Sequence, residues 1–113
     1  MTTEGAAALA EFPELRRLLD LINAGWQLLP VSADGELVEV RGVRAWPGDW
    51  MDTIVVRFTT DAAGLRCGRS GGVVWERVGD LTEVVDGLLA LPPPSDPAAP
   101  QLVLRTTPGL WTP

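Results

Sequence analysis

Alternating apolar residues separated by short turn signals occupy the middle of this chain, and they constrain its fold more than any other feature. The clearest stretch is residues 53–60, where Ile54, Val56 and Phe58 alternate with Val55 and Arg57. A period of two places successive side chains on opposite faces of a strand. We therefore expect a central strand here, within an antiparallel meander.

The remaining strands are predicted between glycine, proline and aspartate residues that favour turns. Asp34-Gly35 is typical of a two-residue hairpin, and residues 61–64 and 70–72 are interpreted as two further turns. The strands predicted around these turns are residues 27–31, 36–46, 65–69 and 73–78.

Within the second predicted strand, the alternation changes phase at Gly42. Val38 and Val40 share one face, whereas Val43 and Ala45 have the opposite parity. One extra residue at a bulge would return the later pair to the core side. We therefore expect this strand to bend at Gly42.

Two amphipathic helices are predicted, one before the meander in the sequence and one after it. Residues 12–24 carry leucine and isoleucine at helical spacing, and Gly25 is a natural stop after them. In residues 80–91, Asp80 is the expected N-cap with Glu83 three positions later, and a run of prolines prevents continuation.

The chain is predicted to form a single domain, because 113 residues are too few for two separate cores. The order α-β-β-β-β-β-α-β predicts an α+β fold, an antiparallel sheet of five or six strands with both helices on one face. We expect a core domain at residues 1–91 and a semi-rigid extended proline-rich spacer at 92–100. We expect residues 101–107 to form a last strand, followed by a tail that ends at residue 113. This strand and tail are expected to return to the same domain or to a second copy.

The absence of several residue types from the sequence excludes several kinds of catalytic chemistry. The chain has no histidine, lysine or tyrosine, and its one cysteine is Cys67. It therefore lacks the imidazole base of a triad, a zinc ligand set, and the lysine that phosphate loops and pyridoxal chemistry require. Residues 68–72 are rich in glycine but lead into a strand, so they predict a hairpin. We expect no cofactor, no metal and no catalytic residue, with Cys67 buried as a small apolar side chain.

Charge and composition also limit the partners. A formal net charge of −6 argues against nucleic acid and anionic membranes. No signal peptide or membrane span is recognisable in the sequence, and a single cysteine needs no oxidising compartment. All basic residues are arginine, as a bacterial genome rich in G and C would produce. We expect a cytoplasmic protein.

The densest unusual cluster joins the second and third strands and contains Trp46, Asp49, Trp50 and Asp52. Tryptophan is enriched at binding hot spots, so this loop can anchor a protein contact or stack on a sugar ring. Alternatively, the rings fold back over the end of the core and the two aspartates form turns.

The arginines are concentrated in the meander. Residues 41–77 contain six arginines and four acidic residues, a balance of +2, whereas the flanking segments have balances of −5 and −3. If Arg57 and Arg66 lie on the solvent face, that face can dock an acidic partner or a carboxylate ligand. Alternatively, these arginines keep an open sheet face soluble and pair with acids on neighbouring strands.

The leading functional hypothesis is a non-catalytic cytoplasmic module, adaptor, chaperone-like or immunity-like, that binds another protein or a second copy of itself. In size, charge and element order the chain resembles bacterial secretion chaperones and toxin-neutralising immunity proteins, although no motif identifies it as either. The residues predicted to bind the partner are Trp46, Asp49, Trp50, Asp52, Arg57 and Arg66.

The alternative hypothesis is a small-ligand-binding domain with a pocket between the helices and the sheet and a weak carboxylate-dependent activity. A cavity of ~300 Å³ or more, lined by tryptophan and a buried acid, would favour this alternative. A filled core with an exposed tryptophan patch would favour the protein-binding hypothesis.

Overall fold

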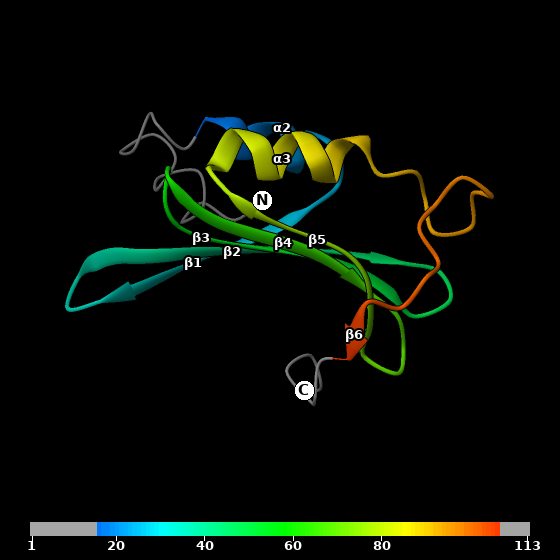
Figure 1. The fold of residues 1–113 in the computed structure, drawn as a ribbon. Coiled ribbons are helices and arrows are strands. Elements are labelled where there is room, and N and C mark those ends of the chain that lie inside the picture. The colour runs from blue at the N-terminus through cyan, green and yellow to red at the C-terminus, as the bar shows by residue number, and fades with distance from the viewer. Residues whose placement is uncertain (1–15, 107–113) are drawn as a thin grey trace.

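Six antiparallel strands form one sheet, and two helices lie on one of its faces (Figure 1). The computed structural model describes residues 16–106. The strands follow one another across the sheet in chain order, so β3 is central, as predicted. The elements are α2 (Arg17–Asn23), β1 (Gln27–Ala33), β2 (Glu36–Trp46), β3 (Trp50–Phe58), β4 (Asp61–Cys67), β5 (Gly72–Gly79), α3 (Leu81–Ala90) and β6 (Arg105–Thr106). The α+β fold and its element order are confirmed.

Two hairpins follow directly from local sequence. At the β1–β2 turn, Asp34 and Gly35 have φ values of 54° and 79°. A two-residue hairpin loop of type I′ requires positive φ at both of its residues. At the β4–β5 turn, the Gly68 amide donates to the Gly72 carbonyl at 3.1 Å. Residues 68–72 therefore form the predicted hairpin.

The predicted bulge at Gly42 is wrong. Gly42 stays in register between Leu28 of β1 and Ile54 of β3. A Cβ at Gly42 would lie 2.7 Å from Leu28 Cδ2 and 2.8 Å from Ile54 Cγ2, so the glycine lets these side chains close over the strand. Val43 and Ala45 consequently remain on the face opposite the core.

The bulge of β2 lies instead at Val38. Val31 of β1 pairs with Glu39, and the next residue, Ser32, pairs with Leu37, which leaves Val38 without a direct partner. Val38 is exposed, whereas Leu37 packs against the core. The expectation that Val38 shares a face with Val40 is therefore wrong, because the extra residue changes the phase between them.

The turn predicted at residues 61–64 is also wrong, because β4 already begins at Asp61 and ends at Cys67. Small residues suit this strand because α3 packs on it: a Cβ at Gly64 would lie 2.9 Å from Val84 Cγ1. Phe58 pairs with Asp61 after a register shift and is 70% exposed, so it leaves the core-facing alternation of β3.

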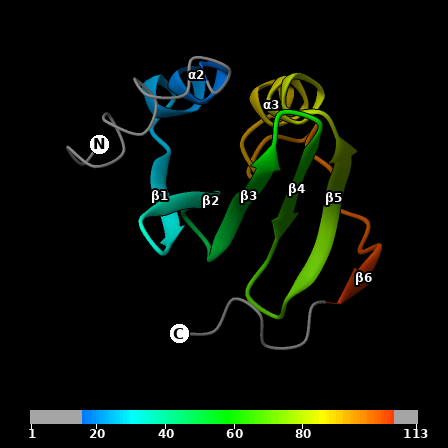
Figure 2. The same ribbon diagram turned by 90° about the vertical axis from the view of Figure 1, so that its left-hand side faces the viewer.

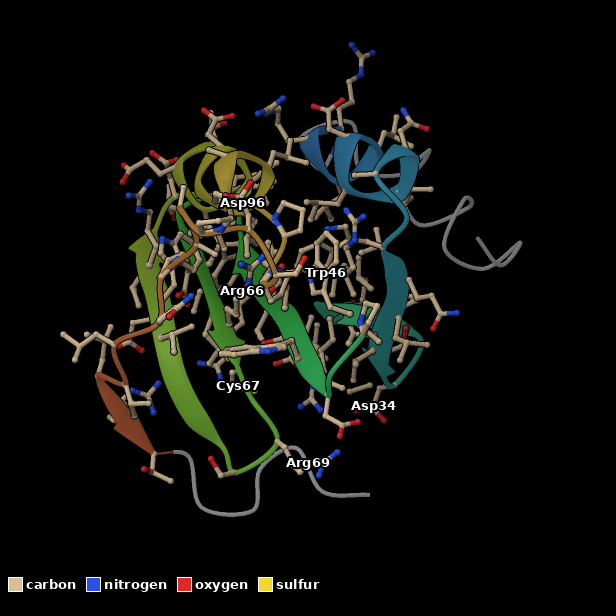
Figure 3. The ribbon with its side chains drawn as sticks, turned by 90° about the vertical axis from the view of Figure 1, so that its right-hand side faces the viewer. Asp34, Trp46, Arg66, Cys67, Arg69 and Asp96 are labelled. Atoms are coloured by element: carbon tan, nitrogen blue, oxygen red, sulfur yellow. The ribbon has the colours of Figure 1, made fainter. Side chains whose placement is uncertain are left out.

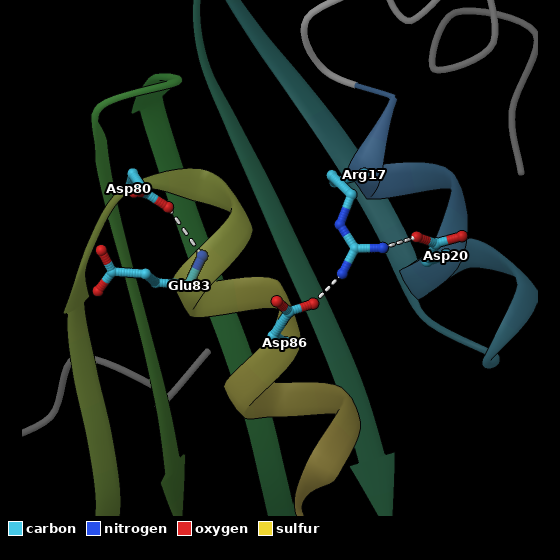
Figure 4. A network of polar contacts seen from close by, with 5 residues as sticks. All are labelled: Arg17, Asp20, Asp80, Glu83 and Asp86. Atoms are coloured by element: carbon cyan, nitrogen blue, oxygen red, sulfur yellow. Dashed lines mark hydrogen bonds and ion pairs between the residues drawn. The ribbon is translucent and has the colours of Figure 1, made fainter.

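The helices cover the core from one side, with α2 on the β1 side and α3 over β4 and β5 (Figure 2). The predicted N-cap of α3 is confirmed, because the Glu83 amide donates to the Asp80 carboxylate at 2.8 Å. Gly25, with φ of 99°, follows the end of α2, and residues 12–15 of that predicted helix lie outside the described residues. Arg17 of α2 pairs with Asp20 and with Asp86 of α3 (Figure 4).

The core fills the space between these layers. Leucine, valine and isoleucine supply most of it, together with one tryptophan, and their burial provides the main driving force for folding. The buried members are Leu18, Leu21, Trp26, Leu28, Val40, Ile54, Val56, Ala62, Leu81, Val84, Val85 and Leu88.

Residues 92–100, called the proline segment below, are not the extended spacer predicted from composition. They fold into two consecutive turns, in which the Asp96 amide donates to Pro93 and the Ala99 amide to Asp96, each at 2.9 Å. The Asp96 carboxylate also accepts from the Ala98 amide at 2.8 Å, a local bond that favours a turn.

The C-terminal strand is shorter than predicted. Among residues 101–106, only Arg105–Thr106 are in a strand, and residue 107 lies outside the described residues. This strand pairs with Gly72 and Val73 of β5, so the chain returns to its own sheet.

Candidate functional site

A buried ion pair joins β3 to β4 at the end of the sheet nearest the proline segment. Arg66 Nε donates to Asp52 Oδ1 at 2.6 Å, and Nη2 donates to Oδ2 at 2.9 Å. Trp46 Nε1 donates to the same Oδ2 at 2.9 Å, and Arg66 Nη1 donates to the Pro92 carbonyl at 2.6 Å. Figure 3 shows Trp46 and Arg66 close together beside the segment that follows α3.

These contacts make the cluster a structural tie. The Arg66 and Asp52 side chains are 0% and 2% exposed, so neither reaches a partner or substrate in this arrangement. Both oxygens of Asp52 accept hydrogen bonds, which offsets the desolvation of its charge. The cluster links the β2–β3 hairpin, the end of β4 and the start of the proline segment.

The expectation that Arg66 lies on the solvent face is therefore wrong. Arg66 is directly opposite Asp52 in the β3–β4 register and points toward the helix side of the sheet. Of the alternative interpretation, the pairing with an acid on a neighbouring strand holds for Arg66, but this buried side chain does not keep an open sheet face soluble. Asp52 is a buried strand residue, so its interpretation as a turn former is also wrong.

The aromatic rings of the β2–β3 hairpin fold over the end of the sheet. Trp46 is half-buried, and the Arg44 guanidinium lies 4.0 Å from its ring centroid. Trp50 is also half-buried, with its ring near Gly68. Asp49, with φ of 62°, forms the turn and is exposed. This geometry agrees with the interpretation of the hairpin as a lid.

The exposed acid of this hairpin and the remaining predicted arginine lie apart from the buried cluster. Asp49 accepts from Arg69 Nε at 2.6 Å. Arg57 is exposed near the far end of β3, where its Nε lies 3.6 Å from the Glu39 carboxylate. The six residues predicted to bind a partner therefore divide among a buried cluster, an exposed turn and a distant arginine.

The sheet face opposite the helices, called the uncovered face below, carries no described helix (Figure 1). Strand register arranges its side chains in three rows across the sheet, and most of them are apolar. The rows are Leu29, Arg41, Val55, Ala63 and Val78; Gln27, Val43, Thr53, Leu65 and Glu76; and Ala45, Met51, Cys67, Val73 and Arg105.

The charges in these rows lie toward the sides of the sheet. Strands β3 and β4 contribute no charged residue to the three rows. At the ends of the first row, Leu29 is 59% and Val78 is 74% exposed. A solvated face of an antiparallel sheet normally alternates polar residues with the buried ones. The uncovered face instead has a mainly apolar centre with charged flanks, and three members of its rows, Thr53, Cys67 and Val73, are already buried within the single chain.

Cys67 lies in the third row and is buried. Burial raises the pKa of its thiol above the usual value, and the nearby Asp52 charge adds to this effect. The thiol therefore stays protonated at neutral pH, which makes it a poor nucleophile. This agrees with its predicted role as a small apolar side chain.

A groove lies between the C-terminal half of α3, strand β5 and the proline segment. Its volume is about 360 Å³, and Trp75 lines it. The acid beside it, Asp86, is paired with Arg17 and more than half exposed, so the groove has the expected size and tryptophan without a buried acid.

Within residues 16–106, no three acidic or thiol side chains gather closely enough to hold a metal ion. None of the described helices has the length and apolar character needed to cross a membrane. No family model matches the chain, and no curated protein or solved structure is significantly similar to it.

Proposed function

We propose that this protein is a non-catalytic protein-binding module whose uncovered face is the binding surface, occupied by a second copy of the chain. The apolar centre of that face carries the proposal. Its exposed apolar residues, Leu29 at 59% and Val78 at 74%, flank half-buried Val55, and apolar surface left in water favours an interaction site. A cytoplasmic location belongs to the same proposal.

Charge placement is compatible with a second copy as the occupant. On one side of the apolar centre, Glu39 lies with Arg41 and Arg57, an excess of one positive charge. On the other side, Glu76 is paired with Arg105.

A two-fold axis along the strands would stack the β2 side of one sheet on the β5 side of the other. That arrangement brings the positive side of each copy toward the neutral Glu76–Arg105 pair of the second copy, so the two faces meet without like-charge repulsion. A two-fold dimer buries the same surface of both copies, and face-to-face sheets pack about 10 Å apart.

The mass of the purified full chain in solution tests this proposal. Light scattering over micromolar concentrations is expected to give a mass near twice the chain mass of 12.1 kDa, falling toward the single-chain mass on dilution. A single-chain mass throughout would contradict it.

A shortened chain ending at Thr106 is the control for the occupant. If a second copy covers the face, the shortened chain forms the same dimer. If the full chain is monomeric and the shortened chain dimerises, residues 107–113 occupy the face instead of a second copy.

A further inference from the structure

We propose that the groove beside α3 binds a carboxylate attached to an aromatic or apolar group. Arg77 would hold the carboxylate, and Trp75 and the surrounding apolar side chains would contact the rest of the ligand. The groove lies on the helix side of the sheet, so this inference does not depend on the proposed function of the uncovered face.

The groove is built by a glycine in the middle of α3. A Cβ at Gly87 would lie 2.8 Å from Trp75 Cζ2 and 2.9 Å from Arg77 Nη1. A glycine inside a helix is destabilising relative to alanine. Here it lets the indole and the guanidinium lie directly against the helix backbone, so two side chains of β5 form one wall of the groove.

The Arg77 guanidinium is available to a ligand. Among residues 16–106 it forms no ion pair, although the chain has more acidic than basic residues. The acid that also lines the groove, Asp86, pairs with Arg17 of α2. The Arg77 guanidinium lies 5.6 Å from the Trp75 ring centroid, which orients it beside an aromatic surface.

The guanidinium, the apolar lining and the volume of the groove indicate which ligand fits it. A guanidinium without a partner binds a carboxylate through two parallel hydrogen bonds, a geometry that a neutral group does not reproduce. The other lining residues, which include Leu91, Pro92 and Pro100, are mainly apolar and fit a ring or a branched aliphatic group. A volume of about 360 Å³ admits a small molecule of this kind.

The first test uses 3-phenylpropionate, with its neutral amide as the matched ligand, titrated into the full ¹⁵N-labelled chain. We expect saturable shifts of the Arg77 and Gly87 amide signals, with a dissociation constant on the order of 1 mM or below. The amide should bind about ten-fold more weakly or worse, because it removes the charge. Equal binding of acid and amide, or no saturable shift, would overturn the proposal.

Two arginine variants locate the site. Arg77→Gln is expected to weaken 3-phenylpropionate binding about ten-fold or more. Arg44→Gln is the control, because Arg44 also lies over a tryptophan and forms no ion pair among the described residues, but does not line the groove. Equal weakening by both variants, or none by Arg77→Gln, would contradict the assignment.

A third ligand distinguishes free acids from the carboxylate at the end of a peptide. A tripeptide ending in phenylalanine presents the same ring and carboxylate as part of a chain. Tighter binding of the tripeptide than of 3-phenylpropionate supports the proposal with peptide ends as the ligand. Weaker binding supports it with small free acids.

Discussion

Replacing Arg66 with methionine is expected to lower the free energy of unfolding by about 3–5 kcal/mol. The substitution leaves the Asp52 carboxylate buried and without its charged partner, and it also removes the donor to the Pro92 carbonyl. A buried charge that loses its partner pays the full desolvation penalty. Equilibrium unfolding in urea measures the change.

Arg69→Met is the matched control, because Arg69 also pairs with an aspartate of the β2–β3 hairpin but is 82% exposed. Its loss should change the free energy of unfolding by no more than about 1 kcal/mol. Adding Asp52→Asn to Arg66→Met should cost less than the sum of the two single changes, because the residues share one interaction. Equal costs for Arg66→Met and Arg69→Met would contradict the structural role of the buried pair.

Replacing Val55 with glutamate is expected to weaken dimer formation by about 100-fold or more. Val55 lies in the middle of the first row of the uncovered face and is half-buried in the single chain. The new carboxylate remains hydrated in the monomer and would lose that hydration in the dimer, which costs several kcal/mol even beside Arg41, the residue opposite Val55 in the β2–β3 register. Sedimentation equilibrium gives the dissociation constant of each variant.

Leu89→Glu controls for the added negative charge. Leu89 is an exposed residue of α3, on the other side of the sheet, so the same change of side chain there leaves the uncovered face intact. Its dimer should dissociate at nearly the wild-type concentration. A similar loss of affinity in both variants would show general charge repulsion and no role for the face.

Local signals predicted the parts of the fold that depend on a few adjacent residues. Asp34-Gly35 and the Asp80 cap each act within one turn of the chain, and the structure confirms both. Gly42 and residues 61–64 were misinterpreted because their role is set by contacts with distant elements. Glycine there makes room for Leu28 and Ile54 in one strand, and for α3 in the other.

Side-chain parity explains why the buried pair was missed. Leu65 and Cys67 are apolar and alternate with Arg66, so the pattern placed the arginine toward solvent. The structure reverses these faces, because Gly64 and Arg66 point toward the helices and the apolar neighbours lie on the uncovered face. A one-residue change of phase exchanges the two faces of a strand. The carboxylate that allows Arg66 to be buried, Asp52, lies on another strand, so the sequence of β4 alone does not fix that phase.

The accessibility of one residue on the uncovered face tests the central claim most directly. Cysteine is introduced at Val55, or at Leu89 as a control, in a chain whose native thiol is removed by Cys67→Ala. The rate of thiol labelling is then measured above and below the concentration at which the dimer dissociates. The account predicts slow labelling at position 55 in the dimer, fast labelling after dilution, and no change at position 89. Equal rates at position 55 under both conditions would contradict it.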